Sequence, residues 1–128
     1  MRAPKITRRF ANGLLLAPLI PASARAHHGW SWAEEAQVEL RGTIREVYVG
    51  QPHPTLRVEA ADGLWTVELG NPSQTARAGF TAASAQAGDV VIALGNRSLD
   101  QRERRLKAVR LTVRDRTYDI YPERIRPS

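Results

Sequence analysis

The sequence predicts an all-β barrel with one short helix, and three observations lead to this fold class. Several segments alternate apolar and polar residues with a period of two, which is typical of half-buried strands. The first segment is long and contains a glycine, and the strongest helix signal falls between the third and fourth segments. A chain of 128 residues with 42% hydrophobic residues is expected to form one compact domain.

The first two strands are predicted on either side of a turn. Residues 38–49 form one long apolar and polar alternation, in which Gly42 predicts a bulge or a sharp bend. The Gly and Pro residues of the segment 50–54 predict a turn. A second strand over 56–60 follows, with charged residues at every other position.

A hairpin and a capped helix come next. Asp-Gly at 62–63 is a strong hairpin signal, and it leads into a third strand over 64–69. Asn71 is a good helix cap, and the helix 72–78 begins with a proline, which suits a first helical position. Gly79 then supplies the left-handed residue at which helices commonly end.

The remaining strands complete a pattern of three strands, a helix and two strands. With a long, bent first strand, this order matches the OB-fold, a five-stranded Greek-key barrel. Another small barrel or a meander of five strands is the alternative. The last two strands are expected over 90–94 and 106–113, with a short extra strand over 118–121. The predicted parts are a signal peptide (1–26), an N-terminal His/Trp segment (27–37), the OB-like barrel (38–121) and a polar tail (122–128).

The first 26 residues have the pattern of a secretory signal peptide. Basic residues and no acidic one precede an apolar stretch over 14–20, and Ala24 and Ala26 stand at positions −3 and −1 of the expected cleavage site. The apolar stretch is shorter than the roughly 20 residues of a membrane-spanning helix. We therefore expect a periplasmic or secreted protein with no transmembrane anchor after processing. The segment 7–10 loosely resembles a twin-arginine signal, so the export route stays open.

Cleavage would also change the charge of the protein. The whole chain has a formal net charge of +6, but five of the basic residues lie before position 27. The formal net charge is then −4 over residues 27–96 and +5 over residues 97–128, which gives the mature chain a net charge of +1. Bulk charge therefore gives no reason to expect nucleic acid as a partner, and we expect a monomer. The absence of cysteine excludes disulfides and thiolate metal sites.

The mature chain would begin with His27 and His28, which is the most informative feature of the sequence. An N-terminal histidine offers its α-amine and its ring to one metal ion, and His53 in the predicted turn adds a further imidazole. Such nitrogen ligands suit Cu(II). Two observations favour the simpler interpretation that these histidines do not form a metal site. Chain ends are commonly solvated, and the first strand, roughly 40 Å long, separates His27 from His53 along the chain.

Two further groups of residues are candidate binding elements. Trp30 and Trp32 are spaced by two, so in an extended segment they face the same way. Their rings are expected either to cover a metal or ligand site or to hold the N-terminal segment on the barrel. A basic cluster falls in the expected loop between the last two strands, where OB-folds often bind their ligands. Aromatic residues, which readers of single-stranded nucleic acid use, are missing from this loop, so we expect an anionic ligand or a protein partner. The cluster consists of Arg97, Arg102, Arg104, Arg105 and Lys107.

The mature chain resembles a family of secreted bacterial proteins of unknown function. Its members begin with a His pair and carry an Asn-Pro-His turn, and the resemblance implies export and a small barrel without implying an activity. This sequence differs in having Gln51 in place of the Asn and Pro54 where an apolar strand residue is usual. The matching elements are His27-His28, Leu40-Arg41-Gly42-Thr43, Gln51-Pro52-His53, Ala78-Gly79-Phe80 and Gly88-Asp89.

These observations lead to a small exported binding protein that is not an enzyme. The leading hypothesis is a metal site, copper first, with His27, His28 and His53 as ligands. The alternative is binding of an anionic ligand or a protein partner through the loop 97–107. A third hypothesis, oxidative copper chemistry like that of lytic polysaccharide monooxygenases, rests on the N-terminal histidine alone.

Overall fold

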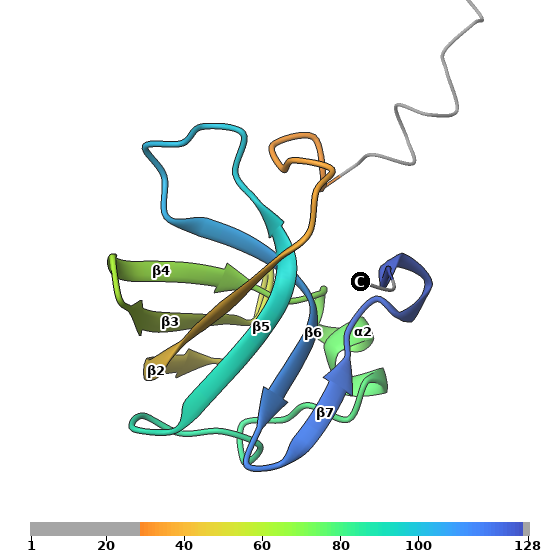
Figure 1. The fold of residues 1–128 in the computed structure, drawn as a ribbon. Coiled ribbons are helices and arrows are strands. Elements are labelled where there is room, and N and C mark those ends of the chain that lie inside the picture. Colours follow the sequence, from red (N-terminus) through yellow and green to blue (C-terminus); the bar gives the residue numbers. More distant parts are fainter. Residues whose placement is uncertain (1–28, 127–128) are drawn as a thin grey trace, which may run out of the picture. The chain divides into compact units, whose positions relative to one another are not determined.

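The computed structural model of the protein describes residues 29–126. The chain divides into two compact units, and the barrel belongs to the second, Trp32–Ser128. Of the first unit, Met1–Ser31, residues 29–31 are described, and they lie in a turn. The elements of the barrel unit (Figure 1) are β2 (Val38–Tyr48), β3 (Thr55–Ala60), β4 (Gly63–Glu68), α2 (Pro72–Arg77), β5 (Val90–Arg97), β6 (Arg105–Val113), β7 (Arg116–Asp119) and the 3-10 helix η3 (Pro122–Arg124).

Five strands close into a barrel with the connectivity of an OB-fold, which confirms the predicted fold class. The sheet runs β4-β3-β2-β5-β6-β7, and an additional pairing of β4 with β6 closes it. This closing pair is parallel, with Thr66 opposite Arg105 and Glu68 opposite Lys107, whereas the other pairs are antiparallel. β7 lies outside the closed ring, paired to the far half of β6.

The long strand β2 belongs to both sides of the barrel. Its first half pairs with β5 and its second half with β3, so that the strand crosses the front of the barrel in Figure 1. The pairing with β3 shifts register at Arg45, which places the bulge three residues beyond the predicted position at Gly42. Gly42 is needed for a different reason: a Cβ at this position would lie 2.4 Å from the carbonyl oxygen of Glu59. The bend therefore follows from close strand packing together with a bulge.

β5 is longer than predicted because a glycine continues the strand. The sequence pattern ended this strand at Leu94, since Gly-Asn normally indicates a turn. In the structure β5 continues through Gly95 to Arg97 with a register shift at Gly95. A Cβ at Gly95 would lie 2.1 Å from the carbonyl oxygen of Lys107, so only glycine lets β6 approach this closely.

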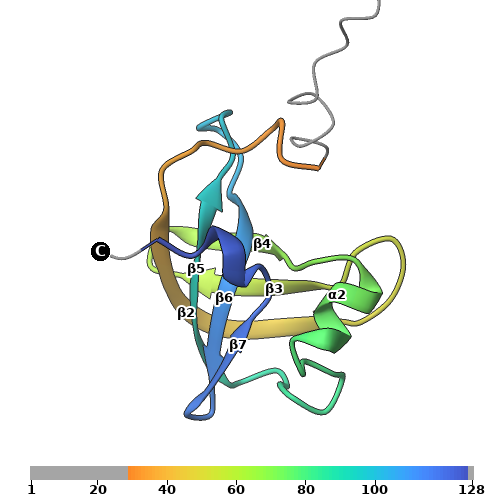
Figure 2. The ribbon, with the colours of Figure 1, turned by 90° about the vertical axis from the view of Figure 1, so that its right-hand side faces the viewer.

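The helix α2 follows the end of β4 (Figure 2); it begins at Pro72 as predicted and ends at Arg77, one residue before the predicted end. Asn71 Oδ1 accepts a hydrogen bond from the backbone nitrogen of Gln74 at 2.8 Å, and Gly79 has a φ of +92°. Phe80 then enters the core, where its ring meets that of Tyr118 edge-on at 5.2 Å. Within residues 29–126, no helix is long and apolar enough to cross a membrane.

The extra strand is displaced from its predicted position by two residues. The sequence placed it over 118–121, and β7 instead spans Arg116–Asp119. A tight turn, in which Arg114 and Asp115 have positive φ values of 54° and 64°, returns the chain directly onto β6. Ile120 and Tyr121 remain buried after the strand has ended.

Replacing Gly95 by alanine is predicted to destabilise the barrel. The added methyl group would collide with backbone atoms of β6, which move only if the pairing moves, so we expect a loss of about 1–3 kcal/mol in the free energy of unfolding. Urea unfolding of Gly95→Ala measures this loss. Gly50→Ala is the matched control, since a Cβ there meets only the end of the half-exposed Tyr48 side chain. Equal stability of the two variants would contradict the prediction.

Candidate functional site

A buried group of charges lies where β4 ends beside β6. Glu68 Oε2 accepts two hydrogen bonds from Arg105, at 2.6 Å from Nη2 and 2.9 Å from Nε. Lys107 Nζ lies 3.8 Å from Glu68 Oε1. The Lys107 side chain is only 2% exposed and that of Glu68 is 14% exposed. A buried ammonium of this kind needs a nearby carboxylate, so Glu68 holds both cations in place.

The surroundings of Lys107 change its proton affinity. Burial lowers the pKa of Lys107, and the negative charge of Glu68 opposes this effect. The ring of Tyr121 lies 5.7 Å from Nζ and is itself buried, and burial raises the pKa of its phenol. The cluster thus combines two cations, one carboxylate and a neutral phenol.

His53 belongs to the same end of the barrel. The next residue, Pro54, accepts a hydrogen bond from the backbone nitrogen of Leu69 at 3.0 Å, and Thr55 pairs with Glu68. Nδ1 of His53 is buried and makes no hydrogen bond within the described chain. Burial and the charges of Lys107 and Arg105 lower the pKa of His53, which Glu68 opposes. The imidazole is therefore neutral near pH 7, the form that binds metal ions.

Trp32 joins the N-terminal segment to this charge cluster. The guanidinium carbon of Arg105 lies 3.6 Å from the centre of the Trp32 ring, close enough for a strong cation–π contact. The Trp32 carbonyl accepts a hydrogen bond from the backbone nitrogen of Leu99 at 2.8 Å. Trp32 therefore packs on the barrel. The expected extended conformation of this segment is wrong at residues 29–32, which form turns.

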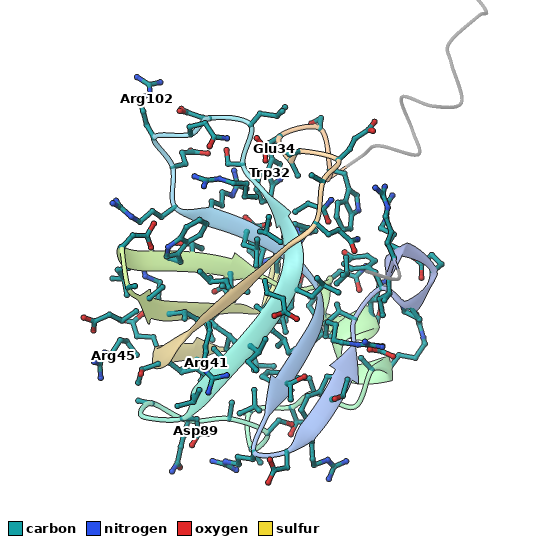
Figure 3. All side chains as sticks on the ribbon, viewed as in Figure 1. Trp32, Glu34, Arg41, Arg45, Asp89 and Arg102 are labelled. Atoms are coloured by element: carbon teal, nitrogen blue, oxygen red, sulfur yellow. The ribbon has the colours of Figure 1, made fainter. Side chains whose placement is uncertain are left out.

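Asn96 fastens the segment that follows Trp32. The residue is 6% exposed, and Nδ2 donates to the carbonyl oxygens of Glu34 at 2.9 Å and Glu35 at 3.0 Å. Figure 3 shows Trp32 and Glu34 beside the loop that bears Arg102. Sequence reasoning missed Asn96, because Gly-Asn was interpreted as a turn. It also missed Glu68, whose alternation pattern resembles that of a solvated face.

The loop that carries the basic cluster is shorter in the structure than the sequence predicts. The connection between β5 and β6 spans residues 98–104, so that Arg97, Arg105 and Lys107 belong to strands. Lys107 is correctly placed near this end of the barrel, but its assignment to an exposed loop is wrong. It pairs with Glu68 across the parallel closure of the barrel, and no sequence pattern reveals that pairing.

Most cations of the basic cluster already have an acidic partner. Arg102 Nε lies 3.0 Å from Asp100 Oδ1, although its side chain projects from the tip of the loop (Figure 3). Arg104 Nε lies 3.7 Å from Asp62 Oδ2. Arg97 instead lies over the ring of the buried Trp65, 5.1 Å from its centre. The geometry of the loop thus adds no support for the anionic-ligand alternative, which stays a prediction.

The metal-binding groups of the described chain are few. No cluster of three or more His, Cys, Asp or Glu side chains with metal-binding geometry occurs within residues 29–126. His53 is the one histidine among the described residues, and the charge of Glu68 acts on its pKa. His27 and His28, like the predicted signal peptide, lie outside the described residues.

Comparison with known families agrees with the resemblance in the sequence. The model of a family of unknown function, DUF6152, matches residues 16–107, more than two thirds of the chain. The chain belongs to this family. The match runs through His53 and Glu68 and ends at Lys107, so it includes the charged residues of the cluster but not Tyr121. No curated protein matches the sequence.

Removing the Glu68 carboxylate is predicted to cost more stability than removing the Lys107 ammonium. Glu68→Gln leaves two cations at a largely buried position without this carboxylate, and we expect a loss of about 3–5 kcal/mol in the free energy of unfolding. In Lys107→Met, Glu68 keeps both hydrogen bonds from Arg105, so the loss is expected to stay below about 2 kcal/mol. Urea unfolding of both variants is the measurement, and the opposite order would refute this description of the cluster.

Proposed function

We propose that this protein is an exported metal-binding protein, with copper as the first candidate. His53 supplies one imidazole, and the processed N-terminus supplies the α-amine and ring of His27 and the ring of His28. The observation that carries the proposal is the Nδ1 atom of His53, buried and without a hydrogen bond in the described chain. Buried polar atoms are nearly always partnered. Thr75, Asn96 and Arg97 of the described chain also have such an atom, but an imidazole nitrogen is the type of atom that binds Cu(II).

The length of chain between the proposed ligands is compatible with their meeting. Trp32 is held on Arg105, which is hydrogen-bonded to Glu68, and the negative charge of Glu68 raises the pKa of His53. Three residues lie between His28 and Trp32, and the four residue steps of an extended chain span at most about 14 Å. The segment meets the barrel beside the end of β5, with Ala33 bridged to Ser98 and Val38 opposite Gly95, and that His27 and His28 reach His53 from there is part of the proposal.

The charges around His53 favour one class of metal. Hard cations such as Ca²⁺ and Mg²⁺ take oxygen ligands, mostly carboxylates. The one carboxylate of the cluster, Glu68, is already bonded to Arg105 and close to Lys107. Neutral nitrogen ligands remain, and these suit Cu(II), which heads the divalent affinity order.

The proposal makes a prediction about cleavage of the signal peptide, because the amine ligand exists only if the mature chain begins at His27. We expect the protein recovered from the periplasm of a producing bacterium to have the intact mass of residues 27–128. One additional residue at the N-terminus would convert the amine of His27 into an amide and remove it as a ligand. A mass that corresponds to any other N-terminus would rule out the amine chelate.

The proposal also makes a prediction about the affinity of the mature protein for copper. Cu(II) titration of the mature protein, followed by electron paramagnetic resonance, is expected to show tight binding with nitrogen ligands. Adding one glycine before His27, or replacing His53 by alanine, should each weaken binding by more than about 10-fold, since even outer partners of metal ligands have effects of that size. Gln51→Ala is the matched control in the same exposed turn. Equal binding by His53→Ala and Gln51→Ala would exclude His53 as a ligand.

A further inference from the structure

We infer that a cavity beside the turn between β6 and β7 binds a phosphate or sulfate group. The cavity has a volume of about 320 Å³ and is lined by residues of the segment 79–84 and of the turn and β7. Figure 1 and Figure 2 show the connection from α2 to β5 crossing the same end of the barrel as this turn. The volume is at the lower end of the range of small-ligand sites, so it fits a free anion or a small monoester.

The side chains that line the cavity carry positive charge. Arg114 and Arg116 line it, and no acidic side chain of the described residues does. Arg116 is exposed and forms no ion pair within residues 29–126; its guanidinium carbon lies 5.8 Å from the centre of the Tyr118 ring. Asp115 lies between the two arginines in sequence, but it lines a different, neighbouring cavity. An anion in the cavity therefore meets at least one cation that has no carboxylate partner in this part of the chain.

Arg114 is held beside the segment 79–84 by two contacts that leave part of its guanidinium open. Nε donates to Asp89 Oδ2 at 3.0 Å, and Nη1 donates to the carbonyl oxygen of Ala83 at 3.4 Å. Nη2 donates to no other described residue, so it is available to a ligand. Asp89 offsets part of the charge of Arg114 and fixes its direction.

The backbone of the turn adopts an unfavourable conformation at this arginine. Arg114 and Asp115 have φ values of 54° and 64°, in the left-handed region that two-residue hairpin turns usually fill with Asn and Gly. Residues held in such conformations are concentrated at binding and catalytic sites. The conformation of the turn therefore supports a binding role for Arg114.

The segment 79–84 supplies hydroxyl groups to the cavity, from Thr81 and Ser84. Ser84 Oγ accepts a hydrogen bond from the backbone nitrogen of Thr81 at 2.8 Å, and Thr81 Oγ1 accepts one from that of Ala83 at 3.2 Å. The two hydroxyl oxygens lie 3.5 Å apart, so at most one of their protons is shared between them and the other is free for a ligand. Guanidinium and hydroxyl donors around one cavity suit a tetrahedral oxyanion, whose oxygens point in several directions.

The absence of competing carboxylates distinguishes this cavity from the basic loop 98–104. In that loop, Arg102 and Arg104 each have an acidic partner, at 3.0 and 3.7 Å, with which an anion must compete. The cavity lies at the other end of β6, so the inference is independent of the proposed metal site.

Titration of the isotope-labelled protein with inorganic phosphate, followed by nuclear magnetic resonance, tests this site. Sodium chloride keeps the ionic strength constant, because nonspecific attraction between exposed charges depends on salt. We expect saturable binding, with the largest shifts at the backbone amides of residues 81–84 and 114–117. Shifts that do not saturate, or that gather at the loop 98–104, overturn the proposal.

Arg116→Gln is the decisive variant, and Arg41→Gln is its matched control. Arg116→Gln should weaken phosphate binding by at least about 5-fold, the effect of one charge-assisted hydrogen bond reduced by exposure. Arg41 is also exposed, forms no ion pair within the described chain and lines the neighbouring cavity, so Arg41→Gln removes the same charge but should bind phosphate as the native protein does. Equal weakening in both variants would mean that phosphate responds to overall charge, and it refutes the site. Arg116→Glu should abolish binding, and saturable binding that survives this change refutes the site as well.

Two further titrations distinguish a free anion from a monoester. Tighter binding of glycerol phosphate than of inorganic phosphate identifies a monoester site, and equal or weaker binding identifies a site for the free anion. Inorganic sulfate should displace phosphate in either case, because it presents the same tetrahedral oxygens. Glycerol alone should leave the amides of residues 81–84 and 114–117 unchanged, and saturable shifts with glycerol would overturn the role of the anion.

Discussion

The parallel pairing of β4 with β6 is the contact on which the rest of this protein depends. It closes the barrel, and it also brings Glu68 of one strand opposite Lys107 of the other. The carboxylate makes the burial of Lys107 tolerable and at the same time gives Arg105 its anchor. The His53 turn lies at this end of β4, because Thr55 pairs with Glu68, and Trp32 packs on Arg105, so that fold closure and the charge cluster are two results of one pairing.

The elements predicted best from sequence were those specified by local chemistry. The Asn71 cap, the Gly79 stop and the Asp-Gly hairpin at 62–63 each act within a few residues, and the structure has all three. Strand ends were predicted less well, since they depend on a neighbour. Gly95 continues β5 because the backbone of β6 lies against it, and a single sequence carries no sign of that contact.

The same distinction applies to the candidate site. His53 was found from sequence because histidine is rare in this chain and its chemistry is specific. Glu68 and Asn96 escaped notice because their roles arise from residues distant in sequence, 37 positions away for Arg105 and 62 for Glu34. Lys107 was singled out for its positive charge. Its burial could not be predicted, because it results from the pairing of β4 with β6, which closes the barrel.

The way Asn96 fastens the N-terminal segment has a consequence for how this family can vary. Its amide group donates to the main-chain carbonyls of residues 34–36 and to none of their side chains. Every amino acid presents the same carbonyl group. Substitutions in these three residues therefore leave the hydrogen bonds from Asn96 in place, although the Glu34 carboxylate also accepts a hydrogen bond from Gln101 at 2.7 Å.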